Sequence, residues 1–297
     1  MIKRINIEPG TVIRGRWYGG EYRVIALLGS GGTARVYLVE DIPGGDRYAL
    51  KLSTDMAGID REYRILARLG PMDNIPAVLY RDDCRVGGIN CYFFVMTYFE
   101  GENLKRVCEA KRMQPKTLVK IAAVTAGICL WLNRRGVFYC DIKPENLVLD
   151  KRGGGLCLVD FGGAVKEGEA VVQFTPAFDR ASWGRGQRTA DEGYQGFAIL
   201  MMLAEMLLGG LRDTGMGFDA LLDTIDKSQL SKGLKKVIIK GLKKDCQSLE
   251  DLINSLSNTA DLIPGGKQRR RQRLDVAINL ALLASIAFFI MVIAVIL

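Results

Sequence analysis

Residues 141–146 read Asp-Ile-Lys-Pro-Glu-Asn, and Asp160-Phe161-Gly162 begins fourteen residues after Asn146. Each motif stands beside an apolar run with strand character, so both are expected at turns. A turn alone would explain Asp-Phe-Gly, but chance rarely produces both motifs in this order and at this separation. Phosphoryl transfer needs a carboxylate near the acceptor hydroxyl, oxygen ligands for Mg²⁺ and cations against the phosphate charge. Asp141 suits the first need, Asn146 and Asp160 suit the second, and Lys143 suits part of the third.

The amino-terminal part supplies a glycine-rich turn between two apolar runs. Residues 24–28 and 35–39 have strand character, and residues 29–34 between them read Gly-Ser-Gly-Gly-Thr-Ala. Glycines let backbone N–H groups approach phosphates because no Cβ stands in the way. An ordinary hairpin would carry the same glycines, so the turn by itself leaves both interpretations open.

A lysine ends the next strand-like segment, Tyr48-Ala49-Leu50-Lys51, where its side chain would point inward. A buried ammonium group needs an anionic partner, since otherwise it loses its proton. Glu62 is the best candidate, on a predicted helix with apolar residues at 59, 63, 66 and 69. A solvated glutamate on an amphipathic helix is the alternative, but the presence of Lys51 favours the pair.

The chain resembles the eukaryotic-like (Hanks-type) serine/threonine protein kinases. The resemblance rests on five features in this order: the glycine turn, the Ala-Leu-Lys strand, the helix glutamate, the 141–146 loop and Asp-Phe-Gly. The resemblance covers about residues 15–258. It implies an α+β, two-lobed fold over residues 15–262, after an extension at 1–14. The small β-rich lobe would span about 15–100 and the larger helical lobe about 101–262, with ATP and Mg²⁺ between them.

The resemblance also implies roles for single residues. Asp141 would accept the proton of the attacking hydroxyl with help from Lys143, and Lys51 would steady the α- and β-phosphates. Asn146 and Asp160 would hold Mg²⁺. The residues expected around the nucleotide are Gly29, Ser30, Gly31, Gly32, Val36, Ala49, Lys51, Glu62, Met96, Thr97, Phe99 and Val148.

The resemblance also implies a position for the hinge. Residues 92–96 would form the strand before a hinge at 97–101. Met96 would then be the gatekeeper, and the backbone of Thr97 and Phe99 would face the adenine.

In the larger lobe, residues 116–133 have apolar residues at helical spacing and are expected to form its central helix. Asp191 matches the family's aspartate that anchors the catalytic loop, and Phe174-Thr175-Pro176 resembles the segment that receives the substrate. Lys143 beside Asp141 implies Ser or Thr acceptors in protein substrates.

The chain departs from the family pattern in several places. Ala34 stands where a third glycine is expected, and Tyr139-Cys140 replaces the His-Arg before the catalytic aspartate. Tyr139 can still pack against Phe161, but a cysteine has no fork of donors for a phosphate. A phosphorylated activation segment normally gains contacts with that arginine. We therefore hypothesise that such a contact is not the switch here.

Residues 180–182 also replace Ala-Pro-Glu, so the family's buried ion pair is in doubt.

Two alternatives remain at this point. A pseudokinase would bind nucleotide as a scaffold at the membrane without turnover. Catalysis is favoured because five polar residues of the site are all present: Lys51, Glu62, Asp141, Asn146 and Asp160. A small-molecule kinase of the aminoglycoside or choline type would share the two-lobed fold. The glycine turn, Lys143 and Asp-Phe-Gly argue against that second alternative.

Residues 276–297 form an uncharged stretch of 22 residues at the carboxyl end. As a helix it would be about 33 Å long, enough for a hydrocarbon core of about 30 Å. A buried core helix is the alternative. Residues 267–273 carry five cations, which could be a solvated linker or a nucleic-acid patch but, beside the apolar stretch, predict a cytoplasmic stop on an anionic membrane surface. We expect a basic linker at 263–274 and one transmembrane helix at 275–297 in the cell membrane, with the kinase domain cytosolic.

Composition agrees with these expectations. The net charge of +8 comes largely from the basic linker, and basic and aromatic residues do not alternate as in a nucleic-acid groove, so no nucleic acid is expected as a partner. Seven scattered cysteines without Cys-x-x-Cys pairs predict reduced thiols. The chain has no histidine, which excludes a histidine base or metal ligand. The simple architecture predicts a bacterial source, and the sequence leaves the substrate and the oligomeric state open.

Overall fold

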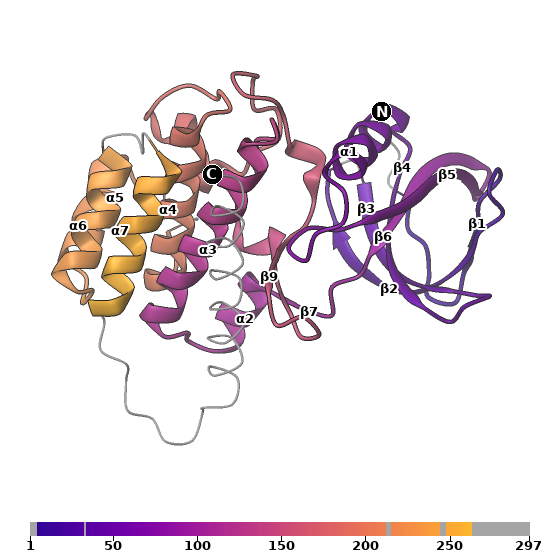
Figure 1. The fold of residues 1–297 in the computed structure, drawn as a ribbon, viewed down its shortest axis with the longest axis horizontal. Helices are drawn as coiled ribbons and strands as arrows, with labels where there is room; N and C mark the ends of the chain where they lie inside the picture. Colours follow the sequence, from indigo (N-terminus) through magenta and orange to yellow (C-terminus); the bar gives the residue numbers. More distant parts are fainter. Residues whose placement is uncertain (1–4, 33, 212–214, 244–247, 263–297) are drawn as a thin grey trace. The chain divides into compact units, whose positions relative to one another are not determined.

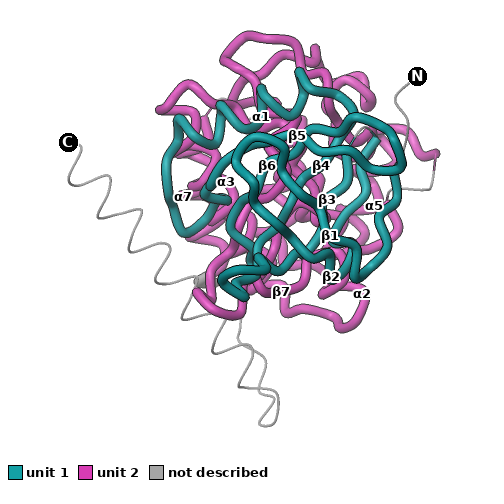
Figure 2. The backbone as a smooth tube through the Cα atoms, turned by 90° about the vertical axis from the view of Figure 1, so that its right-hand side faces the viewer, with its two compact units in different colours: residues 1–99 teal, residues 100–297 magenta. Residues whose placement is uncertain are grey.

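The computed structural model describes residues 5–32, 34–211, 215–243 and 248–262. The chain forms two compact units, residues 1–99 and 100–297 (Figure 2), each of which is described by itself. The division lies beside the lobe boundary expected at about residue 100. The predicted linker at 263–274 and the predicted membrane helix at 275–297 lie outside the described residues.

The first unit contains a six-stranded antiparallel sheet with the strand order β1-β2-β3-β4-β6-β5 and one helix (Figure 1). Its elements are β1 (Val12–Arg14), β2 (Glu21–Ser30), β3 (Ala34–Asp41), β4 (Arg47–Ser53), α1 (Met56–Leu69), β5 (Val78–Val86) and β6 (Ile89–Thr97). Residues 5–14, which we expected to precede this lobe, belong to it. Ile5, Ile7 and Ile13 pack in its core because their apolar side chains cover one face of the sheet.

Strand β4 is buried on both faces, and this decides where Lys51 points. Leu50 and Leu52 belong to the apolar core. Because side chains alternate along a strand, Lys51 faces the opposite side, where α1 packs against β4. Asp55 caps the start of α1 by accepting a hydrogen bond from the Gly58 N–H.

The second unit is mainly helical (Figure 1). Its elements are β7 (Gly101–Asn103), α2 (Leu104–Ala110), α3 (Pro115–Asn133), β8 (Leu147–Asp150), β9 (Leu156–Leu158), α4 (Glu192–Leu208), α5 (Phe218–Lys227), α6 (Lys232–Lys243) and α7 (Leu249–Leu262). Helix α3 is the expected central helix, and it packs against α4 and α7. Strands β7, β8 and β9 form a small antiparallel sheet.

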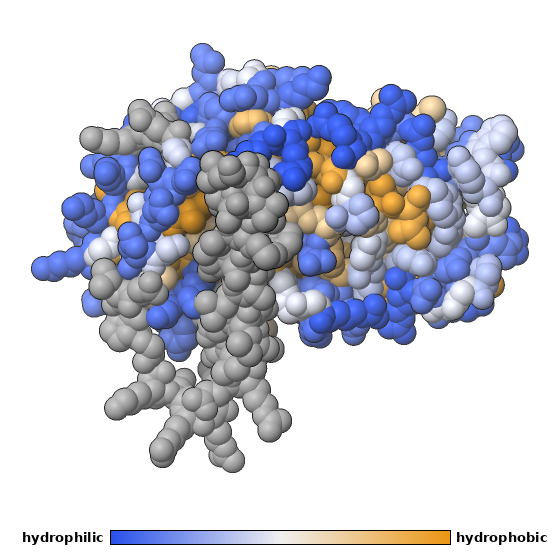
Figure 3. Space-filling model, in the orientation of Figure 1, coloured by the Kyte–Doolittle hydropathy of each residue, from blue (hydrophilic) through white to orange (hydrophobic). Residues whose placement is uncertain are grey.

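Among the described residues, α3 is the helix whose length and composition would let it cross a membrane, and most of it is buried inside the protein. Core helices pass the same test, so this is weak evidence for a membrane span. Exposed large apolar side chains are few in the described part of the chain, with Trp17 and Tyr18 the most exposed. Hydrophilic residues cover much of the face shown in Figure 3.

Candidate active site

In the first unit, the predicted ion pair between Lys51 and Glu62 is present. Lys51 Nζ donates to Glu62 Oε2 at 2.6 Å, and the two side chains are 8% and 3% exposed. Glu62 lies on the buried face of α1 with Ile59 and Leu66. Burial keeps water away from both groups, so each charge depends on its partner of opposite sign for stabilisation. The helix therefore holds the lysine charged and fixed in place.

The glycine turn lies at the end of β2, where Gly29 pairs with Val36 and Ser30 with Arg35. A Cβ added at Gly29 or Gly32 would meet no atom within 4 Å, and one at Gly31 would make only an ordinary contact. Neither crowding within the protein nor a positive φ therefore explains these glycines. A ligand that approaches the backbone closely would explain them.

Other residues predicted around the nucleotide lie on neighbouring strands of the same sheet. Ala49 on β4 is the register partner of Met96 on β6, and Val36 on β3 is the partner of Lys51. The Thr97 N–H donates to Ala77 O at 2.9 Å, so this donor already has a partner within the first unit. Phe99 ends this unit, whereas Val148 lies on β8 of the second unit.

The second unit contains the catalytic loop, which we define as residues 139–146. Lys143 Nζ donates to Asp141 Oδ2 at 2.6 Å, and Asn146 Nδ2 donates to Asp141 O at 2.9 Å and to Asp141 Oδ2 at 3.2 Å. The Asp141 side chain is 2% exposed. The short 3-10 turn Pro144–Asn146 folds the loop back on itself and then leads into β8. Sequence neighbours therefore converge on one buried carboxylate.

Asp160 joins this loop through backbone pairing. Strands β8 and β9 pair at Leu147 and Leu158, and the Val159 N–H donates to Asn146 O at 2.9 Å. Asp160 has φ 64° and is the residue other than glycine with a positive φ among those described. Such a conformation costs energy and is typical of functional sites. The Asp160 carboxylate and the Asn146 amide supply hard oxygen atoms, which are the ligands Mg²⁺ accepts.

Tyr139 packs against Phe161, as expected from its place before the catalytic aspartate. The two rings meet edge to face with centroids 5.0 Å apart, and Tyr139 Oη donates to Val159 O at 2.6 Å. Burial, followed by the charges of Asp141 and Asp160, raises the pKa of the Tyr139 hydroxyl well above its ordinary value. The tyrosine thus remains neutral and joins the two acidic loops.

The acceptor segment, which we define as residues 174–182, reaches the same carboxylate. Thr175 Oγ1 donates to Asp141 Oδ1 at 3.2 Å. Lys143 and Thr175 therefore contact different oxygens of Asp141, which fixes the orientation of the carboxylate.

Cys140 is 2% exposed and lies in an apolar cluster with Phe138, Val171, Ala190 and Tyr194. Burial raises the pKa of its thiol to about 12. The family has an arginine at this position, but here apolar contacts join the catalytic loop to residues on both sides of the acceptor segment. The hypothesis that the kinase is not switched on through a phosphate contact at this position stays a prediction.

Asp191 differs from the expectation that it anchors the catalytic loop. Its carboxylate caps α4 by accepting from the Tyr194 N–H at 2.6 Å, and it pairs with Arg180 Nη2 at 2.9 Å. The anchor is Gln195, whose Nε2 donates to Tyr139 O at 3.2 Å. Gln195 is fully buried in an apolar helix, and a lone amide in such a helix is the signal that could have revealed it.

Comparisons with known proteins agree with these motifs. Residues 22–212 match the family described as the protein kinase domain. The serine/threonine-protein kinase YabT of Bacillus subtilis (strain 168) is 28% identical over 279 residues, which are 91% of this chain and 79% of that protein. The serine/threonine-protein kinase PrkC of the same organism is 28% identical over 210 residues, 66% of this chain and 31% of that protein. Pkn2 of Myxococcus xanthus, another serine/threonine-protein kinase, is 34% identical over 149 residues, 48% of this chain and 18% of that protein.

Proposed function

The chain belongs to the protein kinase family and is a serine/threonine protein kinase, and we propose that Asp141 is the base of its phosphoryl transfer from Mg-ATP to protein hydroxyls. The observation that carries this proposal is the set of contacts on Asp141. A buried carboxylate receives Lys143 on one oxygen and Thr175 on the other. Such a group is oriented and adjacent to the segment that resembles the acceptor site.

The remaining roles follow from charge and position. Asp141 orients the incoming Ser or Thr hydroxyl and accepts its proton. Lys143 offsets the negative charge that builds up as the phosphoryl group moves. Lys51 steadies the α- and β-phosphates, and Glu62 keeps that lysine charged and in place. Asn146 and Asp160 hold Mg²⁺, which supplies positive charge against the phosphates when it is bound.

The test uses the full chain, radiolabelled ATP, Mg²⁺ and dephosphorylated casein, with an aminoglycoside and choline as small-molecule acceptors. We expect label on casein and on the kinase itself, and none on the small molecules. Nucleotide binding without transfer to any acceptor would contradict this proposal and favour a scaffold. Transfer to a small molecule alone would identify a different kinase class.

We also propose that residues 275–297 anchor the kinase in the cell membrane, with the basic run at 267–273 at the anionic cytosolic surface. Support comes from the sequence: 22 uncharged residues follow the five cations. A charge near the centre of a membrane span costs roughly 3 kcal/mol. Ala284→Arg with Ile290→Arg is therefore expected to shift the full chain from the membrane fraction to the carbonate-soluble fraction. Ala284→Leu with Ile290→Leu is the matched control, and equal retention of both variants in the membrane fraction would contradict the anchor.

A further inference from the structure

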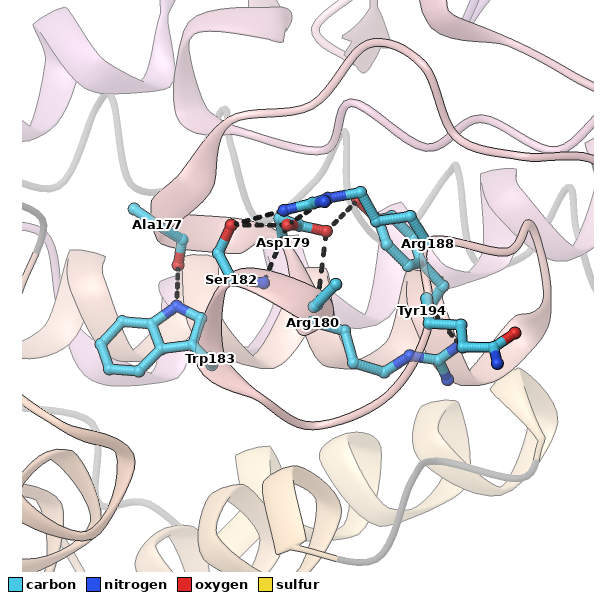
Figure 4. Close-up of polar contacts among 9 residues, drawn as sticks. Ala177, Asp179, Arg180, Ser182, Trp183, Arg188 and Tyr194 are labelled. Atoms are coloured by element: carbon cyan, nitrogen blue, oxygen red, sulfur yellow. Dashed lines mark hydrogen bonds and ion pairs between the residues drawn. The ribbon is translucent and has the colours of Figure 1, made fainter.

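A second buried carboxylate lies at the end of the acceptor segment. Asp179 is 0% exposed, and its Oδ2 accepts hydrogen bonds from Ser182 N at 2.9 Å, Ser182 Oγ at 2.6 Å and Arg188 Nε at 2.8 Å (Figure 4). Tyr194 Oη donates to Asp179 Oδ1 at 3.0 Å. The Ala181 N–H also donates to Oδ1, at 3.4 Å. A buried charge is tolerated when donors surround it, and here five donors do so.

These donors keep the carboxylate ionised. Burial alone would raise the pKa of the Asp179 carboxyl, but the hydrogen bonds from Ser182, Tyr194 and Arg188 outweigh it and hold the pKa below its ordinary value. At neutral pH the group is therefore an anion, and the cation beside it is Arg188.

Arg188 contacts the acceptor segment on both sides of Thr175. Its Nε binds Asp179, and its Nη2 donates to Ser182 Oγ at 3.2 Å. Its guanidinium carbon lies 4.2 Å from the centroid of the Phe174 ring, which is a cation–π distance. One side chain thus holds the segment both before and after the threonine that contacts Asp141.

Helix α4 connects this cluster to the catalytic loop. Tyr194 binds Asp179, and the next residue, Gln195, donates to Tyr139 O in the catalytic loop. Trp183, directly after the acceptor segment, donates from Nε1 to Ala177 O within it at 3.0 Å (Figure 4). The acceptor segment and the catalytic loop are therefore both fixed to the same turn of α4.

We propose that Asp179 and Arg188 form an acceptor clamp, a positioning pair that holds residues 174–182 in the conformation that binds the protein substrate. The chain lacks the Ala-Pro-Glu glutamate, and the clamp instead pairs the buried Asp179 carboxylate of the acceptor segment with the partly exposed Arg188 that follows the segment. The described hydrogen bonds of Asp141 come from Lys143, Asn146 and Thr175 and not from the clamp, so the clamp acts through Thr175 and Phe174 and not on the reacting atoms. This inference rests on the proposed protein kinase function.

The test compares Arg188→Met with the wild-type full chain, with casein as the acceptor. Loss of a hydrogen bond to a charged group predicts a fall of about tenfold or more in kcat/KM for casein, mainly through KM. KM for Mg-ATP and the slow hydrolysis of ATP without acceptor should change less than about twofold, because Lys51 and Asp141 keep their contacts. Arg188→Lys should lie between the two, since lysine keeps the charge but lacks the fork that also reaches Ser182.

Arg185→Met is the matched control. Arg185 lies in the same loop, but its Nη2 donates to Lys243 O and its guanidinium covers Phe218, so it has no contact with Asp179 among the described interactions. Its removal should leave KM for casein unchanged. The double variant Asp179→Asn with Arg188→Met should have a kcat/KM for casein no lower than that of the less active single variant, because the two residues act as one pair.

Hydrogen exchange gives a readout that does not depend on turnover. In Arg188→Met, amides of residues 174–182 should exchange at least about tenfold faster, while those of α3 remain protected. Unchanged exchange there, or an equal loss of casein phosphorylation and acceptor-free ATP hydrolysis, would overturn the clamp. If the wild-type chain phosphorylates no protein but exchange still rises in the variant, the proposed kinase function fails and the positioning by Arg188 stands.

Discussion

The catalytic loop and the acceptor segment each contain a buried carboxylate paired with a cation, but they reach this arrangement differently. In the catalytic loop, Lys143 and Asp141 lie 2.6 Å apart and two residues apart in sequence. Asp179 of the acceptor segment pairs at 2.8 Å with Arg188, which lies nine residues further along the chain and outside that segment. The first pair follows the family motif residue by residue. The second has no counterpart in that motif, and here it fixes the segment.

The difference separates the demands of chemistry from those of support. Proton acceptance and charge neutralisation each need a particular functional group at one place, so Asp141 and Lys143 leave little freedom. Holding a loop needs only enough buried contacts, and many residue sets supply them. Cys140 shows this directly, because apolar packing occupies the position where the family has an arginine. The predictions below test this separation.

The largest effect is expected at the residue whose chemistry cannot be replaced. Asp141→Asn keeps the size of the side chain but removes the base, so kcat for casein phosphorylation should fall by about a thousandfold. Binding of Mg-ATP, measured by calorimetry, should change little. A variant that retains more than about a tenth of the activity would show that Asp141 is not the base, and the proposed division would then fail.

A second large effect should appear in the first unit, where the same rule applies to Lys51. Lys51→Met should lower kcat/KM for Mg-ATP by about a hundredfold, because a charge against the phosphates is lost. Glu62→Gln should produce a smaller loss, since the lysine remains but lacks its anionic partner. Lys227→Met is the control, because Lys227 is exposed and pairs only locally with Asp223. Equal losses in Lys51→Met and the control would contradict the assigned role.

The catalytic loop and the acceptor segment also show how much of the site could be predicted from the sequence. The groups of the catalytic loop and the Lys51–Glu62 pair could be predicted because their chemistry ties residue type to spacing. The acceptor clamp could not, because Asp179, Arg188 and Tyr194 are brought together by turns that leave no periodic pattern. Asp191 was assigned by motif alone, and the structure gives its anchoring contact to Gln195 instead. The residues at 263–297 lie outside the described structure, so the anchor remains a prediction.

A third prediction tests whether the catalytic loop tolerates the family's own residue at Cys140. Cys140→Arg would force a much larger side chain among the buried Phe138, Val171 and Tyr194, although the charges of Asp191 and Asp141 act on this position. We expect the free energy of unfolding to fall by about 2–3 kcal/mol, as measured by denaturant titration. Cys140→Ser, which nearly preserves volume, should cost less. An arginine variant of wild-type stability whose activity rises on autophosphorylation would contradict the view that apolar packing is required at this position.

The smallest effect is expected at Thr175, where the two regions meet. Thr175→Val keeps the shape but loses the hydrogen bond to Asp141, and about 1.4 kcal/mol of orientation energy corresponds to about a tenfold fall in kcat. Thr175→Ser keeps the hydroxyl and should stay within about threefold of wild type. Thr175→Glu would bring a second negative charge beside Asp141, so its rate should not exceed that of the valine variant. A glutamate variant faster than wild type would identify Thr175 as an activating phosphorylation site. The acceptor segment would then be a switch, and holding it in place could no longer be its whole role.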